Sequence, residues 1–432
     1  MTTSIRDLIK RGVAFNYFRC SIKRVTGDGT YDADWIDITD YVLQYPSIST
    51  SYSDVVFLGD YRIDAGQLVL NNSTRRFNDP TDSTSIFYSC LTRYRTRIKI
   101  ECGFKDDDET EVDGLVFHGI VFAEPVSTDG GYITFSVASI LKVFQNYTAF
   151  GVSTSGAPSS ATMIDRLVKL SSGGVRVFDR YLEGTTDAER YQINPDSHTL
   201  TLTAISQPSV QADNTVWDKI ADYSFAEGFF PEIDPSGNFV WDKRTETATI
   251  QWVFNGAGSQ DSDYGINIIS VDRYSDGTNN IWTRFAITYD NNGNVSVAED
   301  SWVPGDLSNT DVYGARTYAK TMLDLDITTS ASVATALQAD YKNAHKELDI
   351  TTVFIPHLRL NDKVQVNYIG QASVANTFTI GVSRIGGPDL LGHRVGSISI
   401  DGLIFKIIGI SHDINMNSGR FCSKFTLREV LS

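Results

Sequence analysis

The chain has 432 residues and a formal net charge of −16 at pH 7. Its length corresponds to about three to four domains of ordinary size, and its charge excludes nucleic-acid binding as the main task, because affinity for phosphate comes from clustered Lys and Arg. Nowhere do about 18 apolar residues follow one another, and no apolar stretch follows the basic residues of Met1 to Gly12. We therefore expect neither a transmembrane span nor a secretory signal.

The four cysteines have no CxxC spacing and no His at the spacing of a metal site. We predict that they are small buried side chains of a protein made in a reducing cytoplasm, without a disulfide framework and without a metal. They are Cys20, Cys90, Cys102 and Cys422.

From about residue 13 to 145 the sequence is typical of short strands separated by turns. In Arg97–Cys102, and again in Ile133–Val137, every second residue is apolar, which indicates strands with one buried face and one wet face. Turn signals recur at Thr26–Gly29, Leu58–Asp60, Asn78–Pro80 and Asp106–Glu109. This spacing favours a β-barrel or a sandwich.

The composition changes at Gly151–Ser160, a stretch rich in Gly, Ser, Ala and Pro that we interpret as a linker. A short helix is predicted next, because the apolar residues of Met163–Val168 have helical spacing. A second helix is predicted over Trp217–Phe225, with Gly228 as its stop signal. It leads into a predicted hairpin over Phe229–Trp241.

The β pattern returns from Gly265 to about Val297. A strand is predicted over Ile281–Tyr289, and Asn292-Gly293 is a type I′ hairpin signal. The longest predicted helix covers Ser332–Leu348, where apolar residues recur every three or four positions. Beyond it we expect extended chain from Ile350 onward.

A short motif occurs twice, as DGLVF at Asp113–Phe117 and as DGLIF at Asp401–Phe405. An alternating strand precedes each copy, a turn begins 16 residues after each Asp, and another alternating strand follows. The matching segments are Arg97–Cys102 and Asp362–Asn367, the turns at Asp129 and Asn417, and the strands Ile133–Val137 and Phe421–Leu427. The second copy carries a longer insert, about residues 369–399. We interpret the pattern as a duplicated β unit; two unrelated β-meanders with similar hairpin chemistry are the alternative.

The sequence contains only weak candidates for catalysis or for binding of a metal, so we predict no catalytic, cofactor-binding or metal-ligating residues. Ser411-His412-Asp413 has the residue types of a triad, but triad residues converge from separate segments, and neighbours on a strand point to opposite faces. The loop Asp28–Asp34 has carboxylates at alternate positions but lacks the EF-hand pattern, which favours a solvated turn. The acidic run Asp106–Asp113 offers ligands for a cation, although such runs are usually exposed loop tips.

The 53 acidic residues allow many carboxylate pairs of the kind that cleave glycosidic bonds, but the diagnostic separation of such a pair is spatial. Aromatic residues between Tyr31 and Phe57 could stack on sugars, although aromatic residues also favour strands and interfaces. A carbohydrate-binding or glycan-degrading β protein is therefore the alternative function, and an adhesion module that binds a host comes third.

Several segments follow one another in an order that carries a resemblance. They are Trp35–Val42, Gly66–Asn72, Phe77–Pro80, Phe117–Val121, the helix around Trp217 with the strand Gly237–Trp241, and Ile407–Asp413. Together they resemble the hub proteins at the tips of bacteriophage tails, a family that includes the baseplate hubs of contractile phages and the tail-tip hubs of long-tailed phages. The resemblance spans nearly the whole chain.

The resemblance implies a mainly β fold with α+β insertions, in which two related β-barrel domains are joined by two smaller α/β domains. We place the first barrel, with an N-terminal arm, at residues 1–148 and an α+β domain at residues 149–253. The second barrel is placed at residues 254–300 and 350–432, with a helical insertion at residues 301–349.

The resemblance further implies a homotrimer that closes or extends the tail tube with pseudo-sixfold symmetry and forms part of the channel for genome ejection. The expected partners are tail-tube or distal tail proteins, the tape measure protein, and tail spike or fibre proteins. DNA would pass through without stable binding, which agrees with the negative charge. Such a protein is no enzyme, needs no cofactor, and lies in the virion at the distal end of the tail, after assembly in the cytoplasm of the host bacterium. We expect no lytic or peptidase region and no fibre-like tail in this chain.

Overall fold

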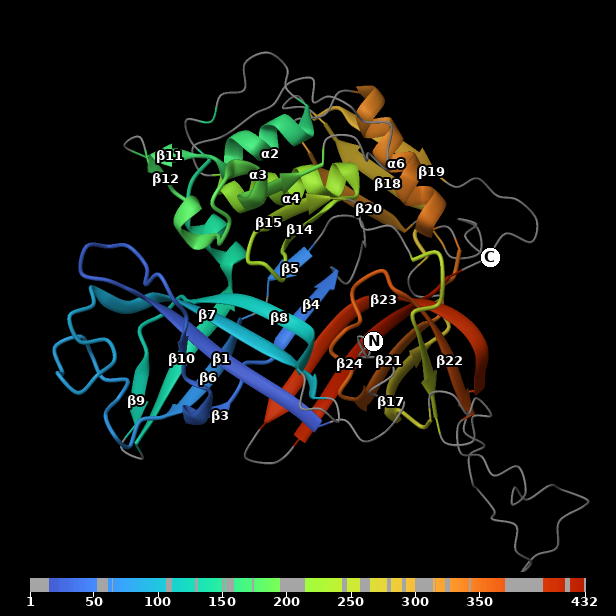
Figure 1. Cartoon of the computed structure of the whole chain (residues 1–432). Coiled ribbons are helices and arrows are strands. Elements are labelled where there is room, and N and C mark those ends of the chain that lie inside the picture. Colours follow the sequence, from blue (N-terminus) through green and yellow to red (C-terminus); the bar gives the residue numbers. More distant parts are fainter. Residues whose placement is uncertain are drawn as a thin grey trace, which may run out of the picture.

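The computed structural model of the protein is mainly β, with two large sheets side by side and a layer of helices and small sheets above them (Figure 1). The structure describes residues 15–52, 61–63, 65–105, 111–128, 131–149, 152, 159–172, 175–194, 214–242, 247–256, 265–277, 281–289, 293–299, 314, 316–322, 327–341, 343–369, 399–415 and 420–430. Several predicted features lie wholly or mostly outside these residues: the N-terminal arm, the acidic loop at 106–109, the linker at 151–160, Asn292, the turn at 417–419 and the insert at about 369–399.

The first sheet has eight strands in the order β2-β1-β7-β8-β10-β6-β3, with β9 paired to β10. They are β1 (Phe15–Val25), β2 (Ile36–Asp37), β3 (Val42–Gln44), β6 (Ala65–Asn71), β7 (Thr92–Lys105), β8 (Glu111–Val121), β9 (Val126–Thr128) and β10 (Tyr132–Ser139), and the short helix η1 (Thr39–Tyr41) precedes β3. In β10 the side chains of Ile133, Phe135 and Val137 are buried, whereas Tyr132 is exposed. This confirms the alternation predicted for the strand.

The second sheet also has eight strands, in the order β16-β22-β23-β24-β21-β17, with β4 and β5 attached through β23. They are β16 (Trp252–Asn255), β17 (Ile268–Ser275), β21 (Glu347–Val353), β22 (Lys363–Ile369), β23 (Ser399–Asn415), β24 (Arg420–Glu429), β4 (Ile48–Tyr52) and β5 (Tyr61–Ile63). By sequence β4 falls within the range predicted as the first barrel, yet it pairs antiparallel with β23. The alternation of apolar and polar residues predicts which face of a strand is buried, but it does not predict which strand lies next to it.

A unit of short helices and strands follows β10 and covers the first sheet. It contains η2 (Ile140–Asn146), α2 (Ser160–Val168), β11 (Ser171–Ser172), β12 (Val175–Arg176), η3 (Asp179–Tyr181), α3 (Asp187–Arg190), β13 (Tyr191–Ile193), α4 (Val216–Glu227), β14 (Phe230–Ile233) and β15 (Phe239–Asp242). Helix α4 begins with a capping box between Thr215 and Asp218 and ends at Gly228, whose φ of +68° is the left-handed conformation of a helix C-cap. The predicted helix over Trp217–Phe225 and the hairpin after it are confirmed.

A separate three-stranded sheet, β19-β18-β20, lies above the second sheet together with a long helix. Its elements are β18 (Arg284–Thr288), β19 (Val295–Glu299), β20 (Thr317–Thr321) and α6 (Ile327–Tyr341). The sequence predicts that Ile281–Tyr289 completes the second barrel. This prediction is wrong, because β18 pairs with β19 and β20 in the separate sheet. The predicted helix over Ser332–Leu348 begins earlier, at Ile327, and ends at Tyr341, and β21 begins at Glu347.

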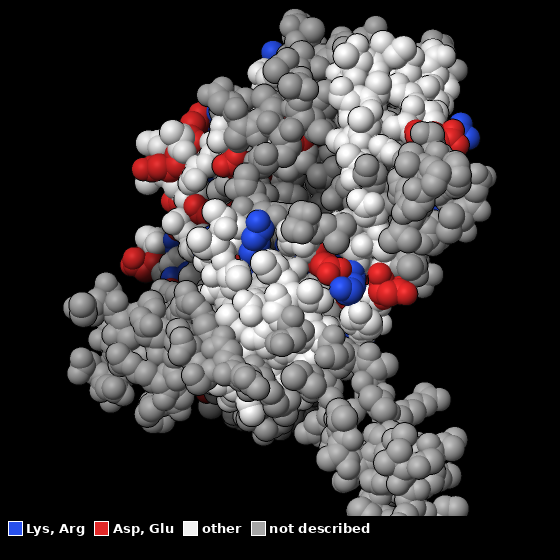
Figure 2. Space-filling view, turned by 90° about the vertical axis from the view of Figure 1, so that its right-hand side faces the viewer, with Lys and Arg blue, Asp and Glu red and all other residues white. Residues whose placement is uncertain are grey.

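The buried side chains form three clusters. One fills the first sheet and includes Ile414 of β23. One fills the unit of short helices and strands above it and includes Ile120 of β8. The third extends from the second sheet into α6 and β18 and includes Phe225 and Phe230 of α4 and β14. Within the described residues, no helix is long and apolar enough to cross a membrane. Among the described residues in the upper part of the face shown in Figure 2, on the side of α6 and β19, few are charged.

Candidate functional site

The two large sheets have the same arrangement of strands. In chain order, the six main strands are β1, β3, β6, β7, β8 and β10 in the first sheet, and β16, β17, β21, β22, β23 and β24 in the second. Across each sheet these strands stand in the order first, fourth, fifth, sixth, third, second. One pairing differs: β1 runs antiparallel to β7, whereas β16 runs parallel to β22. A common order of six strands within one chain supports the duplicated unit inferred from the sequence.

The repeated DGL motif falls on the fifth strand of each sheet, β8 in the first and β23 in the second. On β8, Leu115 and Phe117 lie opposite Cys102 and Ile100 of β7. On β23, Leu403 and Phe405 lie opposite Val366 and Val364 of β22. The two copies of the motif therefore occupy corresponding positions in corresponding strands.

The two sheets are joined by one strand and by a group of aromatic rings. Strand β4 follows the first-sheet strand β3 in the chain but adds to β23 of the second sheet, with Ser51 opposite Gly409. Beside this pairing, the ring of Phe18 in β1 stacks on Phe421 at 4.9 Å and lies 5.5 Å from Phe354. Backbone pairing and apolar burial both hold the sheets together at this junction.

The unit above the first sheet is attached to it by charged residues. Arg97 of β7 donates to Glu183 Oε1 at 2.5 Å, and Lys23 of β1 donates to Glu183 Oε2 at 3.0 Å. The Arg97 side chain is only 3% exposed. Burial would raise the pKa of Glu183, but the charges of Arg97 and Lys23 outweigh it and hold this pKa below its ordinary value. Sequence reasoning missed this ion pair, since Arg97 and Glu183 are 86 positions apart and no local pattern connects them.

A buried histidine makes another contact between the first sheet and the unit above it. His118 of β8 makes a hydrogen bond of 3.1 Å between Nε2 and the carbonyl oxygen of Pro235 in the β14–β15 turn. The turn depends on Gly237, whose φ is +82° and whose missing Cβ would lie 3.0 Å from the His118 ring. Burial lowers the pKa of His118 to about 4, so the ring is neutral at pH 7.

The Ser411-His412-Asp413 segment lies on β23, and its geometry is not that of a triad. His412 is buried, and its Nδ1 lies 2.9 Å from Ser423 Oγ on the neighbouring strand. That hydroxyl oxygen also accepts from the backbone N–H of Ile355. Ser411 makes its contact elsewhere, 3.3 Å from Ser47 Oγ. His412 therefore has a structural role in the packing of β23 against β24. Burial lowers its pKa to about 4.

Two of the three carboxylates in the loop at residues 28–34 are held by protein donors. Asp28 accepts from the hydroxyls of Thr26 and Thr30 and from the backbone N–H of Thr30, while Asp32 pairs with Arg24. This confirms a hairpin turn. In the part of the chain that the structure describes, no group of three or more His, Cys, Asp or Glu side chains is placed to hold a metal ion. The four cysteines are free thiols, three of them buried.

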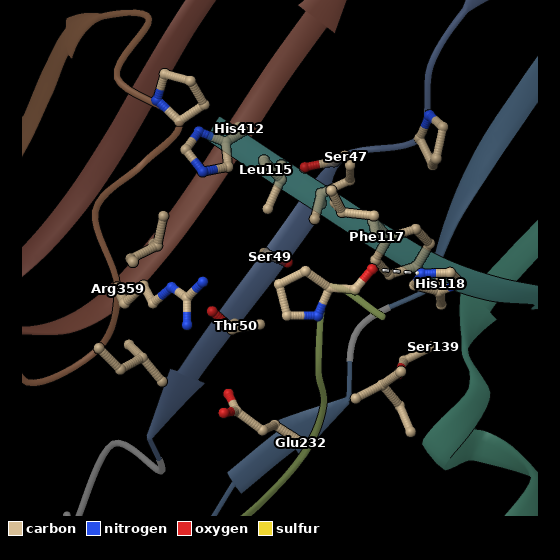
Figure 3. Close-up of a pocket in the computed structure, with 18 of the residues that line it drawn as sticks. Ser47, Ser49, Thr50, Leu115, Phe117, His118, Ser139, Glu232, Arg359 and His412 are labelled. Carbon is tan, nitrogen blue, oxygen red and sulfur yellow. Dashed lines mark hydrogen bonds between the residues drawn. The ribbon is translucent and has the colours of Figure 1, made fainter. Parts of the chain in front are cut away.

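A cavity of about 230 Å³ lies where the two sheets and the β14–β15 hairpin meet (Figure 3). Residues of β4, β8, β14 and β23 line it together with the segment 356–360. Glu232 and Arg359 are its charged residues, and Thr50 and Ser139 add hydroxyls (Figure 3). Its volume is below the range of about 300–1,000 Å³ that is typical of ligand pockets. We interpret it as the space left where three units converge.

The fold is that of a known tail protein. The chain is similar to a tail protein from Neisseria meningitidis, with a TM-score of 0.55 and 11% sequence identity, over 95% of this chain and 96% of that chain. A 43 kDa tail protein of prophage MuSo2 from Shewanella oneidensis is matched with a TM-score of 0.49 and 9% identity, over 95% of this chain and 96% of that chain. No protein-family model and no curated protein matches the chain in sequence. The chain therefore shares the fold of the Neisseria tail protein across almost its entire length.

Proposed function

We propose that the protein is a structural component of a bacteriophage tail tip or baseplate, a homotrimeric hub that closes or extends the tail tube. The observation that carries this proposal is the presence of two sheets with one strand order in a single chain. The fold shared with a tail protein supports it.

In such a hub, the duplication would allow a threefold ring to match a sixfold tail tube. Three copies of a chain with two similar sheets present six similar surfaces around one axis. A threefold ring can then contact a sixfold tube through six comparable contacts, whereas a threefold ring of single units would leave half of the tube subunits without a partner. Matching of symmetry is the proposed mechanism.

The remaining parts of the proposal follow from this position in the particle. The ring would surround part of the channel for genome ejection, and the net charge of −16 would keep DNA from binding to its wall. The partners would be tail-tube or distal tail proteins, the tape measure protein, and spike or fibre proteins. The protein would act in the virion at the distal end of the tail after assembly in the bacterial cytoplasm, with a structural role and no catalysis.

Native mass spectrometry of the purified chain, combined with electron-microscope class averages of the same sample, tests the proposal. We expect a mass near three times 47.8 kDa and a ring with a central hole and a pseudo-sixfold outline. A compact monomer that binds oligosaccharides would contradict the hub and favour the carbohydrate-binding alternative.

A further inference from the structure

Two buried histidines line the cavity that lies where the two sheets and the β14–β15 hairpin meet (Figure 3). His118 belongs to β8 of the first sheet, and His412 belongs to β23 of the second sheet. They are 4% and 2% exposed. We call the contact around this cavity the central junction; it joins β4, β8, β23, the β14–β15 hairpin and the segment 356–360. Both rings therefore lie where parts of the chain that are distant in sequence meet.

The hydrogen bond of His118 fixes the form of its ring. A carbonyl oxygen can only accept, so Nε2, which lies 3.1 Å from the carbonyl oxygen of Pro235, carries the proton and donates it. The other ring nitrogen, Nδ1, is buried and has no hydrogen-bond partner among the described residues. A second proton, on Nδ1, would be a buried charged donor without an acceptor, which costs free energy. The closed central junction therefore holds this ring neutral.

The charges next to His118 act in the same direction. Arg97 and Lys99 of β7 oppose a second proton on the ring. Glu183 favours one, but its carboxylate is already paired with Arg97 and Lys23. Burial, reinforced by the two cations of β7, lowers the pKa of the ring to about 4.

Neutral groups also surround His412. Its Nδ1 lies 2.9 Å from Ser423 Oγ of β24, and the ring of Phe354 stands edge-on to it at 5.6 Å. The titratable group whose charge acts on the ring is His357, which would oppose a second positive charge. Burial is the larger cause that lowers the pKa of His412 to about 4.

The lining of the cavity provides little charge to balance two imidazolium rings. Among the described lining residues, Glu232 of β14 is the one carboxylate, and Arg359 opposes it in charge. The lining residues from β4, β6, β8, β10 and β23 include no Asp, Glu, Lys or Arg. The volume of about 230 Å³ is enough for several water molecules. Water that reaches the rings can solvate charges that the closed contact cannot.

We propose that the central junction is an acid-operated switch, which opens in one step when His118 and His412 each take up a proton. His118 holds the β14–β15 turn on the first sheet, and His412 lies opposite Ile48 of β4. A single separation at the cavity would expose both rings to water, so the two protons would be taken up together. This switch does not depend on the proposed hub.

The direction and size of the effect follow from the two pKa values. In the open form each ring has the ordinary pKa of 6.5, and in the closed form the pKa is about 4, so acid favours the open form. Between pH 7 and pH 5, one ring shifts the equilibrium toward opening by about 22-fold, and two rings that open together shift it by about 500-fold.

Hydrogen exchange at pH 7 and pH 5, corrected for the intrinsic exchange rates, tests the switch. The reporters are β4 and the turn at residues 233–238, and both should lose about 500-fold in protection in the wild type. In His118→Gln, and again in His412→Gln, both reporters should lose only about 22-fold. The double variant should show no pH effect, because neither ring remains to be protonated.

His345→Gln is the matched control. His345 does not line the cavity, and its Nδ1 contacts the carbonyl oxygen of Glu429 at 2.9 Å. Both reporters should therefore behave in this variant as they do in the wild type. Thermal unfolding at pH 7 checks the fold of every variant, and the wild-type measurement is informative without any of them.

Two results would overturn the switch. In one, each reporter loses about 22-fold, and His118→Gln removes the loss from the turn alone while His412→Gln removes it from β4 alone; the rings would then open separately. In the other, both reporters exchange no faster than β10 at either pH, so that only global unfolding exposes the rings. Faster exchange of both reporters than of β10, with the joint loss of about 500-fold, supports the switch.

Discussion

The two large sheets share one strand order but are attached to the layer above them in different ways. The first sheet and the unit above it have separate buried clusters except for Ile120 of β8, which belongs to the cluster of the upper unit, and the ion pairs of Glu183 and the His118–Pro235 hydrogen bond lie between the two. The second sheet shares a single apolar cluster with α6 and β18, and Phe225 and Phe230 of α4 and β14 belong to it as well. One sheet architecture thus supports a joint made mainly of polar contacts in one half and a continuous apolar core in the other. Polar joints respond to pH, whereas an apolar core responds to lost volume.

Removing an aromatic ring from the shared core should have the largest effect. Tyr341 of α6 is 1% exposed, lies 5.9 Å from Phe285, and stands 4.5 Å from the guanidinium of Arg428 on β24. We expect Tyr341→Ala to lower the free energy of unfolding by about 3–5 kcal/mol, measured by urea unfolding at pH 7. Tyr341→Phe keeps the ring and should cost at most about 1.5 kcal/mol. A cost below about 1 kcal/mol for the Ala variant would mean that α6 is not part of this core.

The two buried histidines should make both halves sensitive to acid. The pKa values of His118 and His412 fall from 6.5 to about 4 on folding, so the unfolded chain takes up protons first as the pH drops. Stability is fully present above pH 6.5 and is lost between pH 6.5 and about 4, by about 3 kcal/mol for each ring.

Urea unfolding at pH 7 and at pH 4 checks this prediction in His118→Gln and His412→Gln. In each variant the loss of stability between the two pH values should be about 3 kcal/mol smaller than in the wild type. The first joint should be the more acid-sensitive of the two, because the lowered pKa of Glu183 adds a further loss as the pH falls through it. An unchanged loss in both variants would show that these rings are not neutral in the folded protein.

Breaking the polar joint should have a smaller and more local effect. We expect Arg97→Met to cost about 2 kcal/mol, less than is usual for a broken buried pair, because the Glu183 side chain is 25% exposed and keeps Lys23. Lys99→Met on the same strand is the control, since Lys99 pairs within the sheet with Glu101 and should cost at most about 1 kcal/mol. Hydrogen exchange should rise at residues 179–194 in the Arg97 variant alone. Equal exchange in the two variants would exclude the ion pair as the joint.

Local patterns predicted local structure and missed most pairings between distant segments. The alternation of Ile133–Val137, the helix that became α4 and the repeated DGL motif were all visible, because each depends on residues that are close in sequence. The pairing of β4 with β23 and the separate sheet around β18 could not be predicted from the sequence, because a strand's own residues do not specify its neighbour. The domain boundaries, the trimer and the ejection channel remain predictions.

The position of β4 has a consequence for how the protein is made. Ser47, just before β4, contacts Ser411 on β23, and the two residues are 364 positions apart. A ribosome that adds about 5–20 residues per second needs on the order of 20 to 70 seconds to synthesise that length. During this time the segment that becomes β4 has left the ribosome without the strand that it will pair with. The second sheet can be completed only after translation has passed residue 412, so the halves of this duplicated chain cannot mature as independent units.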